Sequence, residues 1–196
     1  MSMDSAHPDI FVHIRIIVGI VIGLSITRLL TGLSRFVQHP KKERIYPIHI
    51  GWTFFVLLAI IHFWWYEFAL STLQHWTFEV YIFIILYAVL FFLLCTLLFP
   101  DRMDEYAGFK DYFHSRQKWF FGLLTLVFVV DMIDTRLKGA AHFQALGNEY
   151  LIRQIGFAFL ALTAAFVRSV RYHAAFAAIA LVYQFWWILR NFHALS

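Results

Sequence analysis

Two carboxylates interrupt an apolar stretch in the second half of the sequence. Asp131 and Asp134 lie three residues apart in FVVDMIDTRLKG (128–139), within a run that begins near Trp119. On a helix this spacing puts both side chains on one face, about 60° apart. An unpaired charge near the centre of a bilayer costs at least about 2.5 kcal/mol. We therefore predict that this face looks into protein, where its carboxylates pair with cations or carry out chemistry.

The two aspartates differ in depth along their helix. Asp131 lies deeper, and we predict that it is the functional group, which titrates or coordinates a cation as a solute passes. A purely structural role for Asp131 is the alternative. Asp134 lies nearer the helix end and is predicted to form a plain salt bridge. Arg15 and Arg153 lie at a depth that suits them as partners.

Further charged residues share the depth of the two aspartates. They come from four other apolar segments and are Arg15, Glu67, Arg153 and Arg190. Charges of both signs at one depth can neutralise one another in a buried network, or they can line a water-filled vestibule. We predict that these four residues, together with Asp131, Asp134 and His62, line a transport or ion pathway.

The histidines do not indicate a metal or a cofactor. His62 lies near the middle of its apolar segment, whereas His13 lies about two helical turns nearer one membrane face. A bis-histidine haem needs ligands at matching depth, and the sequence has no HxxxH, ExxH or Cys/His cluster. We therefore expect no cofactor and no metal site, and we expect His62 to bond a neighbouring helix.

Aromatic residues are concentrated at two segment ends. HFWWYEF (62–68) and QFWWILRNF (184–192) are predicted to form an interfacial belt. The alternative is an aromatic-walled cavity for a quinone or a lipid. The sequence has no Gly-rich phosphate loop, nucleophile elbow or acid–histidine constellation, so it does not indicate an enzyme.

The composition identifies the class of protein. The chain has 196 residues, of which 61% are hydrophobic and 14% charged, with a mean hydropathy of +0.69. A soluble domain of this size could not bury so much apolar surface. The formal charge of +4 does not indicate nucleic acid, because the basic residues lie in short loops between apolar blocks. The single Cys95 excludes an intramolecular disulfide.

The apolar blocks predict an all-α integral membrane protein with six transmembrane helices in a single domain. A span needs about 20 residues, and the predicted helices cover 10–37, 47–72, 77–99, 117–138, 150–170 and 173–193. Between the third and fourth helices, 101–115 has apolar residues at near-helical spacing. This segment is predicted either as a short interfacial helix or as an ordinary loop.

The Lys and Arg residues predict an orientation in the membrane, because cytoplasmic loops are enriched in them. Ten of the 16 fall in the loops after helices 1, 3 and 5: Arg35, Lys41, Lys42, Arg44, Arg102, Lys110, Arg116, Lys118, Arg168 and Arg171. The opposite side has Arg136, Lys138, Arg153 and Arg190. Both termini are therefore predicted to lie outside the cytoplasm, in a protein of the cell (inner or plasma) membrane.

Two further patterns concern packing. IGWTFFVLLA (50–59) resembles IGFAFLALTA (155–164), and TRLLTG (27–32) resembles TRLKG (135–139), which suggests two inverted three-helix repeats or a coincidence between apolar strings. Gly19, Gly23 and Thr27 recur at intervals of four on helix 1. Such rows let a neighbouring backbone approach closely, so a tight helix–helix seam is predicted.

Together these features favour a small channel or transporter for an ion or small solute, embedded in the lipid bilayer as a homo-oligomer. A non-catalytic signalling or assembly subunit is the second hypothesis. A quinone- or lipid-handling membrane enzyme is the third. No nucleic-acid partner is expected.

The orientation leads to a testable prediction. A reporter fused after Lys42 should be cytoplasmic, and one fused after Ser196 should be exterior, because the basic loops remain inside. Reporter activity on either side of the membrane measures this. A cytoplasmic C-terminus would contradict the orientation or the number of spans.

Overall fold

The computed structural model describes residues 6–40, 44–73 and 76–191, so Lys41, Lys42 and Ser196 lie outside the described residues. Within these ranges the chain is helical and has no strand. The α-helices are α1 (Ala6–Gln38), α2 (Pro47–Tyr66), α3 (Phe78–Leu98), α4 (Phe109–Leu137), α5 (Ala140–Ala145), α6 (Gly147–Ala164) and α7 (Val170–Asn191). A 3-10 helix, η2 (Glu67–Thr72), continues directly from α2.

Four of the described helices are long and apolar enough to cross a membrane. They are Ile10–Gln38, Pro47–Ser71, Phe78–Leu98 and Val170–Asn191. α4 and α6 are not among them. α4 carries charged residues at both ends, and α6 begins with several polar ones (Asn148, Glu149, Arg153 and Gln154). The all-α class with several candidate spans is thus confirmed.

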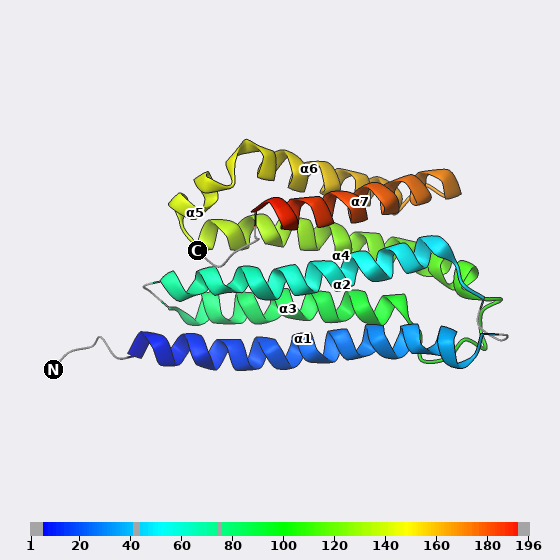
Figure 1. The fold of residues 1–196 in the computed structure, drawn as a ribbon, viewed down its shortest axis with the longest axis horizontal. Helices are drawn as coiled ribbons and strands as arrows, with labels where there is room; N and C mark the ends of the chain where they lie inside the picture. The colour runs from blue at the N-terminus through cyan, green and yellow to red at the C-terminus, as the bar shows by residue number, and fades with distance from the viewer. Residues whose placement is uncertain (1–5, 41–43, 74–75, 192–196) are drawn as a thin grey trace.

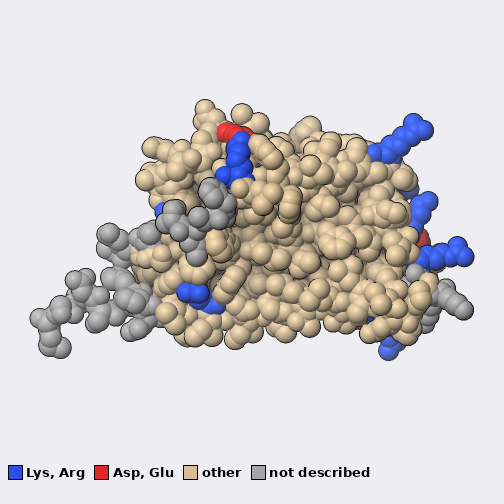
Figure 2. Space-filling view, viewed as in Figure 1, with Lys and Arg blue, Asp and Glu red and all other residues tan. Residues whose placement is uncertain are grey.

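The long helices lie side by side with roughly parallel axes, so their connections gather at two ends (Figure 1). The α1–α2, α3–α4 and α6–α7 connections lie at one end, which we call the basic end. The start of α1, the α2–α3 connection and α5 lie at the other, which we call the Asp131 end. Lys and Arg side chains project from the basic end (Figure 2).

Local signals explain several helix boundaries. Pro47 occupies the first turn of α2, where its missing N–H costs nothing. The Thr77 hydroxyl accepts a hydrogen bond from the Val80 N–H and so caps α3. α4 starts earlier than the predicted residue 117. Of the segment 101–115, the part before Gly108 forms turns and bends, and the part from Phe109 onward is the beginning of α4 rather than a separate interfacial helix.

The two halves of the chain pack differently. In the first half α1 lies mainly against α3, whereas in the second half α4 lies mainly against α6. α2 packs against α7, and α3 against α4. An inverted repeat would place α4 against α7 in the way that α1 lies against α3. The described helices do not follow that arrangement.

The C-terminal end of α3 is held by side chains from its neighbours. The last carbonyls of a helix have no partner within it. Here the Tyr112 hydroxyl donates to the Leu97 carbonyl (2.9 Å), and His49 Nε2 lies 2.7 Å from the Leu98 carbonyl oxygen. Arg28 donates to the Phe99 carbonyl (2.9 Å) and Arg35 to that of Pro100 (3.0 Å). α1, α2 and α4 are thereby fixed to α3 at the basic end.

The close approach on α1 occurs at Gly32 rather than along the predicted row. A Cβ at Gly32 would collide with the Phe99 ring, and one at Gly19 would lie 3.1 Å from the Trp64 side chain. Gly23 and Thr27 are exposed in the single chain, and a Cβ at Gly23 would meet nothing within 4 Å. The row Gly19–Gly23–Thr27 therefore packs against its own chain only at Gly19.

This difference can be tested with paired substitutions. Gly32→Leu should lower the free energy of unfolding by about 1–3 kcal/mol, because the added side chain overpacks the contact with Phe99. Gly23→Leu should leave the free energy of unfolding of the monomer unchanged, because a Cβ at this position meets nothing within 4 Å. Thermal unfolding of both purified variants in detergent measures the effect. Equal stability of the two would contradict the packing at Gly32.

Candidate functional site

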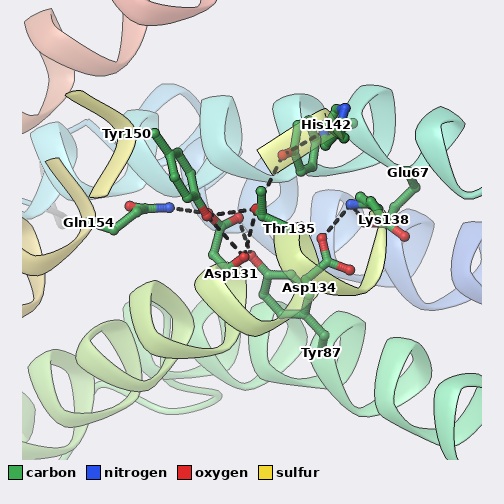
Figure 3. A network of polar contacts seen from close by, with 10 residues as sticks. Glu67, Tyr87, Asp131, Asp134, Thr135, Lys138, His142, Tyr150 and Gln154 are labelled. Atoms are coloured by element: carbon green, nitrogen blue, oxygen red, sulfur yellow. Dashed lines mark hydrogen bonds and ion pairs between the residues drawn. The ribbon is translucent and has the colours of Figure 1, made fainter. Parts of the chain in front are cut away.

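Asp131 is held by uncharged donors from two neighbouring helices. The Tyr87 hydroxyl of α3 donates to Asp131 Oδ1 (2.9 Å), and the Tyr150 hydroxyl of α6 donates to Oδ2 (2.7 Å). The Gln154 amide, also on α6, donates to Oδ2 as well. Figure 3 shows these side chains converging on the carboxylate. The carboxylate therefore lies in a cradle of hydrogen-bond donors.

The spacing of residues along α6 builds half of this cradle. Tyr150 and Gln154 are four residues apart, so they project from the same face of the helix. Both are buried, at 3% and 2% exposure. The arginine between them in sequence, Arg153, is 9% exposed and also faces inward. α6 thus turns its polar first turns toward α4.

Arg153 reaches Asp131 through an amide rather than directly. Its guanidinium donates to Gln154 Oε1 (3.4 Å) and to Gln184 Oε1 on α7. Gln154 in turn donates to Asp131. The guanidinium also lies over the Trp187 ring, 5.1 Å from its centroid. Carboxylate and guanidinium are therefore bridged by one side-chain amide.

An internal cavity opens beside Asp131, between α2, α3, α4, α6 and α7. It holds about 40 Å³ of space, enough for roughly two to three water molecules. Its polar lining comprises His62, Asp131, Arg153, Gln154 and Gln184 together with tyrosines, and the rest is apolar. Carboxylate and guanidinium thus face a space that suits water or a small ion.

A second charged group lies one turn further along α4. The Lys138 ammonium donates to Asp134 and to Glu67 Oε1 (2.7 Å), and all three side chains are buried. The ammonium also lies 3.9 Å from the centroid of the Tyr66 ring. The partner of Asp134 is therefore Lys138, four residues on, and not one of the arginines that the sequence suggested. This group ties the end of α2 to the end of α4.

This triad holds two carboxylates against one ammonium. Glu67 Oε2 and Asp134 Oδ1 are buried and have no hydrogen-bond partner among the described residues.

Arg15 and Glu67 line one small cavity between α1 and η2. The Arg15 guanidinium lies over the Phe68 ring (4.6 Å). Within the described part of the chain, no three His, Cys, Asp or Glu side chains could hold a metal ion.

The structure divides the predicted pathway residues into three sets. Asp131, Arg153 and His62 line the cavity. Asp134 and Glu67 belong to the Lys138 triad. Arg15 and Arg190 lie away from the cavity. Arg190 pairs with Glu149 (2.5 Å) on an exposed surface and lies over the Trp186 ring (4.2 Å).

A line of hydroxyl groups leads from Asp131 toward α5. The Tyr150 and Thr135 hydroxyls lie 2.6 Å apart, and the Tyr66 hydroxyl donates to Thr135 Oγ1 (3.1 Å). His142 Nε2, on α5, lies 2.8 Å from the Tyr66 hydroxyl oxygen. These contacts connect the carboxylate of Asp131, at the cavity, to His142 on α5 at the end of the bundle (Figure 3).

Sequence reasoning missed several of these residues. From the sequence, Lys138 counts only as a basic residue of the outer side at the end of the predicted helix 117–138, although its spacing of four from Asp134 is that of a helical ion pair. Tyr150 and Gln154 also show helical spacing, but nothing in the sequence connects them to α4. Tyr87 and Tyr66 lie in apolar blocks with many aromatic residues, and no sequence signal distinguishes them.

The triad predicts an asymmetric response to substitution. Lys138→Met should lower the free energy of unfolding by about 3–5 kcal/mol, because two buried carboxylates lose the one ammonium that contacts them among the described residues. Combining it with Glu67→Gln and Asp134→Asn should recover most of the loss. The control is Arg136→Met, an exposed cation two residues away. If thermal unfolding shows Lys138→Met to be as stable as the control, the triad is not a buried ion pair.

No family model, curated protein or solved structure matches this chain. The chemistry open to the site therefore follows from its own groups. These are a carboxylate cradled by uncharged donors, a guanidinium one amide away, and a space of about 40 Å³ beside both.

Proposed function

We propose that the chain is a six-span membrane protein that moves a small ion or solute through the cavity beside Asp131. The added spans are α4 and α6, whose outward faces support this assignment. Between residues 119 and 133 of α4 and between residues 152 and 162 of α6, the exposed large side chains are apolar: Trp119, Leu126, Val129 and Ile133 on α4, and Ile152, Ile155, Phe159 and Leu162 on α6. Their polar residues Asp134, Gln117 and Gln154 are buried instead. Such helices present hydrocarbon to lipid despite a modest overall hydropathy.

The lengths of these two helices also suit a span. At about 1.5 Å per residue, the 18 residues of α6 extend about 27 Å, close to the thickness of the hydrocarbon core. α4, with 29 residues, is longer and extends past α6. In this proposal the protein lies in the cell membrane. Its basic end faces the cytoplasm, and its Asp131 end faces outward. The cavity then lies in the outer half of the bilayer.

The observation that carries the proposal is the charged cavity itself. A carboxylate inside a membrane is costly and is commonly found on ion or proton pathways. Asp131 lines a space of about 40 Å³. Ligand sites for drug-sized molecules are about 300–1,000 Å³, so this space suits an ion or water and not a quinone ring. The size of the cavity favours ion movement over the quinone-handling alternative.

Packed aromatic rings lie between the cavity and the basic end. The Trp52 ring is 5.3 Å from that of Phe121, 5.7 Å from that of Phe120 and 4.9 Å from that of Phe176. All four side chains are buried. We take this arrangement as the outward-facing state of a carrier, in which the aromatic plug must rearrange before a solute reaches the cytoplasm.

Two partners belong to this proposal. The bilayer surrounds the exposed apolar faces of the long helices. A second copy of the chain is proposed to pack along the face of α1 that carries Gly23 and Thr27, whose small side chains are exposed in the single chain. The effect of Gly23→Leu on the oligomeric state in detergent tests the second partner, since a bulky side chain there would prevent close packing.

Ion flux into liposomes tests the proposed function. The purified protein should carry a flux of H⁺, Na⁺, K⁺ or Cl⁻ that empty liposomes lack. Asp131→Asn should fold but reduce this flux at least tenfold, because the amide retains the size of the side chain without its charge. The control is Glu105→Gln, which removes an exposed carboxylate at the basic end.

Two results would contradict the proposal. One is the absence of flux for every ion with folded wild-type protein. The other is an Asp131→Asn variant whose folding and flux both equal those of the control. A variant that loses stability, and regains it when its charge is exchanged with that of Arg153, would assign Asp131 a structural role instead.

A further inference from the structure

The contacts between His142 and Asp131 can be oriented in one direction along their whole length. Tyr66 donates to Thr135, and His142 Nε2 lies 2.8 Å from the Tyr66 oxygen, which accepts when Nε2 carries the hydrogen. Tyr150 donates to Asp131 Oδ2, so its oxygen is free to accept from Thr135. Each group then donates to the next, from the imidazole to the carboxylate. A chain of hydroxyls oriented in this way can pass a proton without moving a heavy atom.

Thr135 controls whether the chain is connected. Its hydroxyl has one hydrogen and two acceptors within reach, the Asp131 carbonyl oxygen (2.8 Å) and the Tyr150 hydroxyl (2.6 Å). When the hydrogen points to the carbonyl, the chain is interrupted. When it rotates toward Tyr150, the chain is complete.

We propose that the species carried at Asp131 is the proton, and that His142 delivers it from the aqueous side through Tyr66, Thr135 and Tyr150. This inference rests on the proposed function and names its substrate. His142 is the entry group, because it lies on α5 outside the long helices and is only partly buried. Asp131 is the acceptor at the inner end of the chain.

The transfer balances as follows. A proton from water binds His142 Nδ1, and the proton on Nε2 passes to the Tyr66 oxygen. The Tyr66 proton moves to Thr135, that of Thr135 to Tyr150, and that of Tyr150 to Asp131 Oδ2. Four O–H bonds form and four break, counting the O–H bond of the hydronium ion that supplies the proton, while one N–H bond forms and one breaks on His142. The net change is one proton moved from hydronium to Asp131. His142 ends neutral with its hydrogen on Nδ1. The chain is reset when the hydroxyls rotate back and His142 loses its Nδ1 proton to water and regains one at Nε2.

The surroundings of Asp131 favour a proton over a metal cation. Tyr87, Tyr150 and Gln154 all direct hydrogens at the carboxylate oxygens. A metal cation such as Na⁺ needs several oxygen lone pairs directed at it, as hard cations generally do. It would have to displace these donors. A proton joins the carboxylate through a hydroxyl that is already in contact.

The charges around His142 suit a transient carrier. Burial and the nearby Lys138 ammonium lower the pKa of His142. The Tyr66 ring centroid lies 5.1 Å from that of His142, and Arg136 lies over the ring of the adjacent Phe143 (5.3 Å). A ring that is neutral at pH 7 keeps one nitrogen free to accept a proton while the other donates. A strongly basic group would retain the proton instead.

The groups that face Asp131 also permit protonation. Arg153 is bridged to it by Gln154, and His62 lines the same cavity. Tyr87 and Gln184 complete the polar lining from α3 and α7. Because the guanidinium does not contact the carboxylate directly, no ion pair has to break when Asp131 gains a proton.

Proton flux under an imposed pH gradient tests the proposal. The protein is reconstituted in liposomes that contain a pH-sensitive dye, with the membrane potential clamped by K⁺ and valinomycin. Tyr66→Phe should lower proton flux at least tenfold, because a phenyl ring neither accepts from His142 nor donates to Thr135. The control is Tyr106→Phe, which removes a hydroxyl in the loop at the basic end.

A second variant, His142→Ala, tests the relay if Tyr66→Phe is unstable. His142 lies on the partly exposed helix α5, and its replacement should lower proton flux to a similar extent. Imidazole added to the outer solution should restore it, since a free base can replace the missing entry group. A merely structural histidine would not be replaced in this way.

The outcomes separate this inference from the proposed function. Flux of Na⁺, K⁺ or Cl⁻ that requires Asp131 and moves no protons would overturn the proton assignment and leave the proposed function standing. Proton flux that is unaffected by both Tyr66→Phe and His142→Ala would overturn the relay. If no ion moves at all, the proposed function itself fails, and this inference fails with it.

Discussion

The constraint on which the whole structure depends is that polar groups buried among apolar helices must find their partners inside the protein. At the basic end, Arg28, Arg35, His49 and Tyr112 satisfy the last carbonyls of α3. At the opposite end buried charges also need partners, and the Lys138 ammonium forms ion pairs with Glu67 and Asp134. Asp131 is satisfied differently, by neutral donors. These hydrogen bonds and ion pairs between helices fix how the helices lie against one another.

The two charged groups at the Asp131 end have complementary properties. The Lys138 triad joins α2 to α4 through direct ionic contacts, so its geometry is expensive to change. The Asp131 cradle consists of hydroxyls and an amide that can rotate without separating charges. Tyr66 connects the two, because its ring lies against the Lys138 ammonium while its hydroxyl contacts His142 and Thr135, which in turn contacts Tyr150 of the cradle. The ionic contacts of the triad therefore hold the Tyr66 ring in place, while its hydroxyl takes part in the line of hydrogen bonds.

Much of the architecture follows from the sequence, and the pairing of side chains does not. Long apolar blocks bounded by Pro47 and Thr77 predict where α2 and α3 begin, because these residues act locally. The cost of burying charge predicts that Asp131 and Asp134 face inward. The order of packing is not predictable in this way, because apolar helix faces resemble one another and α1 could lie against any neighbour. For the same reason the close contact at Gly32, and the roles of Tyr87 and Tyr150, depend on tertiary contacts that no local pattern encodes.

In the proposed six-span arrangement, the polarity of α4 has a consequence for how the protein is made. As an isolated segment emerging from the ribosome, α4 would carry Asp131, Asp134 and Lys138 into the membrane without most of their eventual contacts. Tyr66, Glu67 and Tyr87 lie earlier in the chain and are synthesised first. α2 and α3 can therefore receive α4 as it leaves the insertion machinery, and α6 adds Tyr150 and Gln154 later. The order of the helices along the chain is thus also a workable order of membrane insertion.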